Sequence, residues 1–277
     1  MSDDERTART RRQMLGLIGG VGATVILAAC GESGTTAKKA SGSANTTLGK
    51  VTSTTLGSAT STTSAPVILT TIGKIPEETG GPFPGDGSNG PNILTQTGVV
   101  RSDIRSSIGT ASAVAKGMPL TISLVLADTS NPGKPLAGAA VYVWHCDIDG
   151  NYSMYGNASA QNYLRGVQVA DSNGVVNFTS IFPAAYSGRW PHIHFRIYPN
   201  LAAVTSGSSK LRTTQLALPE SVCKEVYATD GYSGSVRSLA QTSLQSDNVF
   251  SDGSSLQVAT VTGSPTAGYT AKLTVGI

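Results

Sequence analysis

The sequence contains little histidine and little cysteine, with three residues of each among 277. It has no C-x-x-C pair, which excludes a thiolate zinc site of the usual spacing. It also lacks the G-x-S-x-G motif of many hydrolases and a glycine-rich phosphate loop followed by Lys-Ser/Thr. These absences disfavour structural zinc sites, serine hydrolases and nucleotide-phosphate chemistry.

Charged residues are also scarce. They make up 13% of the chain, and the formal net charge is +3. No cluster of lysine and arginine occurs in the part that is expected to be globular, so we expect no nucleic-acid partner. After residue 30, no apolar run reaches the roughly 20 residues of a membrane-spanning helix.

Residues 1–30 are typical of an export signal. Arg11 and Arg12 lie in TRRQML, which resembles the twin-arginine (Tat) signal, and an apolar stretch from Met14 to Ala29 leads to Cys30. The order basic, apolar, small-small-Cys is that of a bacterial lipoprotein signal; the alternative is a single membrane anchor helix. We therefore expect an exported chain that is anchored to the membrane only through lipid on Cys30, or else secreted.

Residues 31–66 consist almost entirely of Ser, Thr, Gly, Ala and Lys, which predicts a flexible tether. Residues 67–277 then form one domain of a size that suits an all-β fold. Within it, Cys146 and Cys223 form either one disulfide or two separate buried thiols. The sequence is compatible with a monomer or a homodimer.

Alternating β-branched and aromatic residues predict seven strands in this domain. The predicted strands cover 120–128, 139–147, 174–181, 192–199, 213–219, 256–263 and 269–277, and one short helix is expected at 219–228. Clusters of Gly, Pro, Asn and Asp separate them. This pattern predicts an all-β fold, an antiparallel β-sandwich with long loops that form the functional site.

His192 and His194 carry the first chemical signal. Residues i and i+2 of a strand point to the same face, so both imidazoles project together and could bind a transition metal. An H-x-H pair also occurs by chance on solvent-facing strands. Tyr186 lies six residues earlier and Tyr152 follows a predicted strand, and phenolate oxygens suit ferric iron better than ferrous iron or zinc.

The sequence resembles the intradiol ring-cleavage dioxygenases, a family that includes catechol and protocatechuate dioxygenases. Within this family it resembles the exported bacterial branch. The resemblance covers about residues 76–277. It is carried by ETGGPFPGD (78–86), by residues 101–128, by LAGAAVYVWHCDIDGNYSMYG (136–156) with residues 163–198, and by TTQLALP (213–219). The segment Leu201–Leu211 and the residues after Gln215 depart from the family pattern.

The resemblance implies an Fe(III) site with four protein ligands. By position these ligands are Tyr152, Tyr186, His192 and His194, and Tyr186 is the one that leaves the metal when substrate binds. Arg189 matches the arginine beside the substrate, and Gln215 a glutamine behind the ligands. Tyr155 and Tyr163 are the obvious alternatives for the tyrosine ligands, and His145 is expected to be structural.

The implied reaction is cleavage of a catechol-type aromatic diol by O2 between its two hydroxylated carbons, which gives a cis,cis-muconate-type diacid in aromatic catabolism. One alternative is a non-catalytic β-sandwich module that binds aromatic or carbohydrate ligands. Another is a cupin-like metalloenzyme, for which His145 is the only further histidine. Substrate choice among the catechols cannot be read from the sequence.

Overall fold

The computed structural model describes residues 72–206 and 209–277, which belong to one compact unit, Thr62–Ile277. The predicted signal peptide, the predicted tether and Cys30 lie outside the described residues. No helix in the described part is long and apolar enough to span a membrane.

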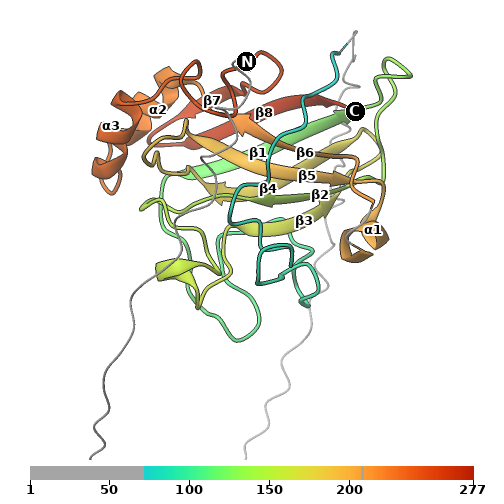
Figure 1. The fold of residues 1–277 in the computed structure, drawn as a ribbon, viewed down its shortest axis with the longest axis horizontal. Coiled ribbons are helices and arrows are strands. Elements are labelled where there is room, and N and C mark those ends of the chain that lie inside the picture. The colour runs from blue at the N-terminus through green and yellow to red at the C-terminus, as the bar shows by residue number, and fades with distance from the viewer. Residues whose placement is uncertain (1–71, 207–208) are drawn as a thin grey trace, which may run out of the picture. The chain divides into compact units, whose positions relative to one another are not determined.

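Most of the regular secondary structure in the described residues is strand, arranged as two four-stranded sheets (Figure 1). One sheet has the order β4-β1-β8-β7 and the other β3-β2-β5-β6. The strands are β1 (Pro119–Ala127), β2 (Ala140–Trp144), β3 (Arg165–Val169), β4 (Val175–Ile181), β5 (His192–Tyr198), β6 (Arg212–Ala217), β7 (Thr260–Ser264) and β8 (Gly268–Gly276). The helices are η1 (Gly156–Ala158), α1 (Leu201–Ser206), α2 (Glu220–Tyr227) and α3 (Ser233–Ala240).

All seven predicted strands and the helix at 219–228 are confirmed, with ends shifted by a few residues. The sequence reading missed β3, because its five residues include Gly166 and lack a clean alternation, and it also missed α1 and α3. Helix α1 lies within the segment Leu201–Leu211 that departs from the family pattern.

The expectation of purely antiparallel pairing is wrong at one place, because β1 pairs with β8 in parallel over Leu120–Ala127. The other five strand pairs are antiparallel. A tight hairpin forces neighbouring strands to run in opposite directions, but β8 pairs with a strand far away in sequence. No tight turn therefore joins β1 to β8, and a parallel pair becomes possible.

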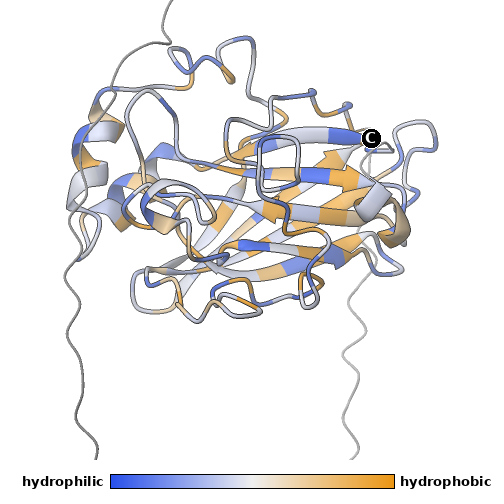
Figure 2. Cartoon of the chain, turned by 60° about the horizontal axis from the view of Figure 1, so that its bottom comes forward, coloured by the Kyte–Doolittle hydropathy of each residue, from blue (hydrophilic) through white to orange (hydrophobic). Residues whose placement is uncertain are grey.

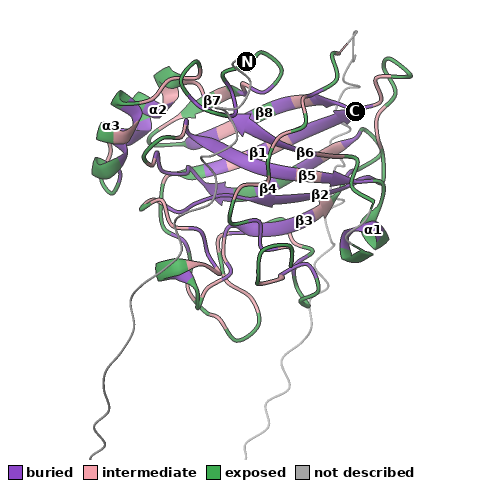
Figure 3. Cartoon of the chain, viewed as in Figure 1, coloured by how far each residue is buried: buried purple, intermediate pink, exposed green. Residues whose placement is uncertain are grey.

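One apolar core contains residues from both sheets. Ile122 and Leu124 of β1 belong to the same buried cluster as Val143 of β2 and Phe195 of β5. Figures 2 and 3 show the same pattern, with hydrophobic and buried residues along the strands and exposed residues mainly in the loops. This core accounts for one face of each sheet.

The other face of sheet β3-β2-β5-β6 is also buried. A second cluster joins Tyr142 and Trp144 of β2 to Ile93, Tyr152 and Ala184 of the loops. As a result, every residue of β2 is buried and β5 is buried at all positions except Arg196. Loops that cover a strand face in this way can position polar side chains away from bulk water.

Cys146 and Cys223 are both buried and both free in the structure. Cys146 Sγ lies 3.7 Å from the carbonyl oxygen of Ala184. The structure therefore favours two separate thiols over a disulfide. Burial raises the pKa of the Cys146 thiol to about 12, so at neutral pH it is a packed, unreactive group.

His145 connects the two sheets. Its Nδ1 lies 2.8 Å from the carbonyl oxygen of Cys146, and its Nε2 lies 2.7 Å from Ser180 Oγ at the end of β4. The side chain is 1% exposed, and burial lowers its pKa to about 4. These contacts agree with the expected structural role.

This burial predicts a pH dependence of stability. Between about pH 4 and 6.5 the unfolded chain binds a proton at His145 that the folded chain excludes, so the free energy of unfolding falls as the pH falls. His145→Gln should reduce this slope by up to about 1.4 kcal/mol per pH unit. Urea unfolding of the metal-free protein at several pH values measures the slope; identical slopes for both proteins would contradict the assignment.

Candidate metal centre

The candidate site grows from one row of residues across sheet β3-β2-β5-β6. Strand register places Arg165 opposite Trp144, Trp144 opposite His194, and His194 opposite Gln215. Side chains of paired residues lie on the same face of a sheet. The side chains of these four residues therefore lie side by side on the face that the loops cover.

His192 and His194 project from β5 toward these loops, and each is 2% exposed. Their Nε2 atoms lie 3.1 Å apart. His192 Nδ1 lies 2.5 Å from the carbonyl oxygen of Trp190, to which it can only donate a hydrogen bond. Nε2 of the neutral imidazole is therefore unprotonated, and its lone pair points into the site.

Tyr152 reaches the same point from the loop after β2. Asp147 shapes this loop, because its Oδ1 accepts hydrogen bonds from the backbone N–H of Asp149 at 3.0 Å and of Asn151 at 2.9 Å. Tyr152 follows directly and is 5% exposed. Its hydroxyl lies 3.3 Å from His192 Nε2.

Tyr186 reaches the site from the turn before β5. The backbone N–H of Arg189 donates to the carbonyl oxygen of Tyr186 at 3.3 Å, which closes a four-residue turn. Gly188 has φ +82°, a value that glycine adopts without strain. The Tyr186 hydroxyl lies 3.1 Å from Tyr152 Oη and 3.1 Å from His192 Nε2.

Four of the six separations between the donor atoms are thus 3.1–3.3 Å: His192 Nε2 lies that close to each of the other three atoms, and the two phenol oxygens lie that close to each other. Donors held about 2.0–2.1 Å from a shared metal ion in a tetrahedral arrangement lie roughly 3.3–3.4 Å from one another. His192 Nε2 has three such neighbours but a single lone pair, so it can accept only one hydrogen bond. This crowding fits a shared cation better than a hydrogen-bond network.

The protonation states of the four groups follow from burial. Burial lowers the pKa of His192 to about 3 and that of His194 well below its ordinary value, with Arg189 contributing to both shifts. Burial also raises the pKa of Tyr186 to about 12 and that of Tyr152 well above 10. Without a cation the imidazoles are therefore neutral, with a lone pair available to a metal ion, and the phenols keep their protons.

His194 is held by contacts rather than by a hydrogen bond. Its ring stacks on Trp144 with centroids 4.9 Å apart and planes at 4°. Its Nδ1 is buried and has no hydrogen-bond partner among the described residues. The backbone of Gly81, at φ +68°, packs against the same imidazole ring. A Cβ added at Gly81 would lie 3.3 Å from His194 Cε1.

Arg189 and Gln215 lie together beside the donors. Arg189 Nη2 donates to Gln215 Oε1 at 2.6 Å, and Gln215 Nε2 donates to the carbonyl oxygen of Thr79 at 2.9 Å. On its other side, Arg189 Nε donates to Asp247 Oδ2 at 2.9 Å. The structure therefore brings all six predicted site residues into one place and adds Asp247 to them.

Arg165 connects the loops that cover the site. It is fully buried, and its guanidinium donates to the carbonyl oxygens of Phe83, Pro84 and Ser153 and to the hydroxyls of Ser153 and Tyr142. These five acceptors match its five N–H groups. Together these hydrogen bonds hold the Phe83 segment against the loop of Tyr152.

A cavity of about 410 Å³ opens above the donors. That volume lies within the roughly 300–1,000 Å³ typical of small-molecule sites. Its walls come from the site residues and from loops that are distant in sequence: Thr79, Gly81, Pro82, Phe83, Tyr152, Tyr186, Arg189, His194, Asn248 and Val249.

The two alternative tyrosine ligands are engaged elsewhere. The Tyr155 hydroxyl accepts a hydrogen bond from the backbone N–H of Gly85 at 3.0 Å, and the Tyr163 hydroxyl donates to Asp147 Oδ2 at 2.9 Å. In the described ranges, no group of three or more His, Cys, Asp or Glu side chains could hold a metal. A cupin-like centre that uses His145 therefore finds no support.

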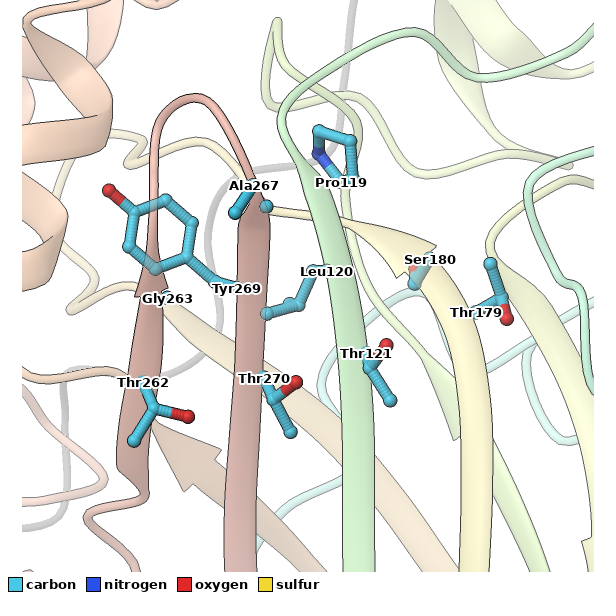
Figure 4. A pocket seen from close by; sticks show the side chains of 11 residues that line it. Pro119, Leu120, Thr121, Thr179, Ser180, Thr262, Gly263, Ala267, Tyr269 and Thr270 are labelled. Atoms are coloured by element: carbon cyan, nitrogen blue, oxygen red, sulfur yellow. The ribbon is translucent and has the colours of Figure 1, made fainter.

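A second hollow, of about 220 Å³, lies on sheet β4-β1-β8-β7 (Figure 4). A row of four threonines crosses the four strands there in register, namely Thr179, Thr121, Thr270 and Thr262. Hydroxyl and apolar side chains line the hollow, without the nucleophile–base pair or metal ligands that chemistry requires.

Sequence reasoning missed several residues of the site. Asp247, Asn248 and Val249 come from a segment with no recognisable motif, and Asp247 lies 58 residues from Arg189. Phe83 lies within the quoted GGPFPGD patch but had no assigned role; its ring centroid lies 5.3 Å from that of Tyr152. Trp144 stacks on His194, a contact that follows only from strand register.

Comparison with known proteins identifies relatives. A family model described as a dioxygenase matches residues 90–192. Catechol 1,2-dioxygenase of Pseudomonas sp. (strain EST1001) is 37% identical over 54 residues, which cover 20% of this chain and 18% of that protein. Chlorocatechol 1,2-dioxygenase of Rhodococcus opacus is 38% identical over 90 residues, covering 25% of this chain and 34% of that protein.

The matched segments thus span a third or less of the length of these curated relatives. A solved structure gives a longer match. The intradiol ring-cleavage dioxygenase of Tetranychus urticae aligns with 74% of this chain and 95% of its own, at 25% identity and a TM-score of 0.57. Together with the family model, these similarities support a relationship between this chain and the intradiol ring-cleavage dioxygenase family.

Proposed function

We propose that this protein is an Fe(III)-dependent intradiol dioxygenase. It cleaves a catechol-type diol with O2 between the two hydroxylated carbons and yields a cis,cis-muconate-type diacid. The observation that carries the proposal is the close approach of two phenol oxygens and a second imidazole nitrogen to His192 Nε2, within 3.1–3.3 Å, at a cavity that Arg189 also lines. The fold we infer around them is a β-sandwich whose long loops build the metal site.

The donor set fits ferric iron. Tyr152 and Tyr186 would supply two hard anionic oxygens, and His192 and His194 two neutral nitrogens, which suits a trivalent ion. Bound Fe(III) would supply Lewis-acid chemistry, binding both oxygens of a catechol and activating its ring toward O2.

Tyr186 is placed to handle a substrate proton. It lies in a turn and is more exposed than Tyr152, which is packed in the second core. Burial raises the pKa of Tyr186 to about 12. A Tyr186 phenolate that gives way to the substrate therefore takes up a catechol proton at Oη, which keeps the net charge of the site nearly constant.

Arg189 is placed to stabilise negative charge on the substrate ring. Nε and Nη2 are held by Asp247 and Gln215, while Nη1 has no partner among the described residues. The guanidinium thus presents a fixed, partly unsatisfied edge at the cavity. Preorganised donors of this kind stabilise developing charge without reorganisation at the moment of reaction.

The apolar parts of the cavity orient a flat ring. Phe83 packs against Tyr152, and Pro82 and Val249 complete the walls. An aromatic substrate can lie between these side chains with its two oxygens directed at the four donors. The same walls limit the access of water to the reacting atoms.

Colour tests the metal assignment. Charge transfer from tyrosinate to Fe(III) should give the iron-loaded protein a broad visible absorption band. Tyr152→Phe and Tyr186→Phe should each shift or weaken this band, because each removes one phenolate donor. Tyr155→Phe is the matched control and should leave the band unchanged, since its hydroxyl contacts Gly85 rather than the donors. A colourless sample with one iron per chain would contradict the ligand set.

Oxygen uptake tests the reaction. The iron-loaded protein should consume one O2 per catechol, and mass spectrometry should show a product with both oxygen atoms incorporated. Arg189→Gln should lower kcat by about 10²- to 10³-fold, the usual effect of losing one preorganised donor, while the visible band persists. Catechol that binds without oxygen uptake would instead indicate a non-catalytic binding module.

We also propose that the protein is exported and anchored through lipid on Cys30, on the strength of residues 1–30 alone. In a bacterial host with the Tat and lipoprotein pathways, the wild-type chain should incorporate labelled fatty acid and fractionate with membranes. Cys30→Ser should lose the label and remain unprocessed or be released. An unlabelled wild-type chain in the soluble fraction would rule out the anchor.

A further inference from the structure

Asp247 is a buried carboxylate at the rim of the candidate site. Its side chain is 0% exposed, and its two oxygens make different contacts. Oδ1 accepts hydrogen bonds from the backbone N–H groups of Val249 at 2.8 Å and Phe250 at 3.2 Å. Oδ2 accepts from Arg189 Nε at 2.9 Å and from the backbone N–H of Trp190 at 2.6 Å.

The two halves of the carboxylate therefore serve different parts of the molecule. Oδ1 caps its own segment, which carries the cavity-lining residues Asn248 and Val249. Oδ2 reaches across to the turn that carries Tyr186 and Arg189. Capping the local backbone requires only one acceptor oxygen, which a serine or asparagine also supplies. Oδ2 accepts from both the Trp190 backbone N–H and Arg189 Nε, and of these two donors only Arg189 carries a charge that the carboxylate balances.

The guanidinium of Arg189 is planar, so two fixed N–H groups determine its orientation. Asp247 fixes Nε, and Gln215 fixes Nη2. Loss of the Asp247 contact leaves one anchor, about which the plane can rotate.

Asp247 also sets the charge of the cavity. Without a bound metal, Arg189 is the only one of the ten lining residues with a formal charge, and Asp247 balances that charge from behind the wall. The remaining lining groups are neutral and largely apolar. Because the charge of Arg189 is already paired with Asp247, the wall offers no uncompensated cation to a carboxylate on a substrate ring, and burying an unpaired carboxylate is costly.

We propose that Asp247 is a positioning residue: it fixes and neutralises Arg189, and thereby makes the site selective for catechols without an anionic ring substituent. The inference rests on the proposed dioxygenase function. It adds two things to that function. The first is a residue, Asp247, that acts through Arg189, and the second is a substrate class, catechols without an anionic ring substituent.

The test compares Asp247→Asn with wild type on two substrates, catechol and protocatechuate, which is a catechol with a ring carboxylate. Wild type should prefer catechol. Asp247→Asn should lower kcat on catechol by about 10²-fold through misplacement of Arg189, with little change in KM. It should also shift the ratio of kcat/KM values toward protocatechuate by at least about tenfold, because Arg189 is then an uncompensated cation.

Asp252→Asn is the matched control. It removes the same charge from an exposed position five residues along the same segment, and it should leave both substrates unaffected. The Fe(III) absorption band should be the same in wild type, Asp247→Asn and Asp252→Asn, which shows that the metal site is intact. Asp247→Ser keeps a capping oxygen for Val249 and Phe250 and replaces Asp247→Asn if that variant does not fold.

A double-mutant cycle separates positioning from a general structural role. If Asp247 acts through Arg189, the double variant Arg189→Gln/Asp247→Asn should be no slower than Arg189→Gln alone. Losses that multiply, or equal losses on catechol and protocatechuate, would overturn the proposal. So would a wild-type preference for protocatechuate. In each of these three outcomes, a coloured and active wild-type enzyme would contradict only the role of Asp247 and would still support the dioxygenase function. A colourless and inactive wild-type protein would contradict the dioxygenase function itself.

Discussion

The candidate site depends on the burial of both faces of sheet β3-β2-β5-β6. One face packs in the core shared with the other sheet, and the second face is covered by loops. A strand face covered by loops is shielded from water, so polar side chains on it must find partners in the loops or hold something else. His192 and His194 lie on this face, with neutral imidazoles whose lone pairs converge.

The loops are in turn held by ion pairs and hydrogen bonds from the sheet. Arg165 of β3 binds three loop carbonyls, and Arg196 of β5 pairs with Asp86. Charged donors form stronger hydrogen bonds than neutral ones, which compensates in part for the burial of a guanidinium. The sheet thus positions the loops, and the loops position Tyr152 and the cavity wall. Removal of such a buried charge would disturb several loops at once.

The sequence was sufficient to predict much of this arrangement. Alternation placed the strands, and the i, i+2 spacing placed His192 and His194 on one face. Tyr152 and Tyr186 could be selected only through resemblance to a family, because nothing in their local sequence distinguishes them from Tyr155 or Tyr163. The contact between Asp247 and Arg189 could not be predicted, because the two residues lie far apart in sequence and no local pattern encodes a contact of that kind. The parallel pairing of β1 with β8 was not predicted for the same reason.

The division of the donors between strand and loop has a mechanical consequence. His192 and His194 belong to a strand that is paired on both sides and packed on both faces, so their positions are nearly fixed. Tyr186 belongs to a short turn with a glycine at positive φ, where a change of a few backbone angles moves the ring. The exchange of Tyr186 for a substrate that we propose needs this asymmetry, with two rigid histidines to keep the proposed metal and one tyrosine free to leave. The turn also carries Arg189, so any movement of Tyr186 takes place beside a guanidinium that Asp247 and Gln215 hold in place.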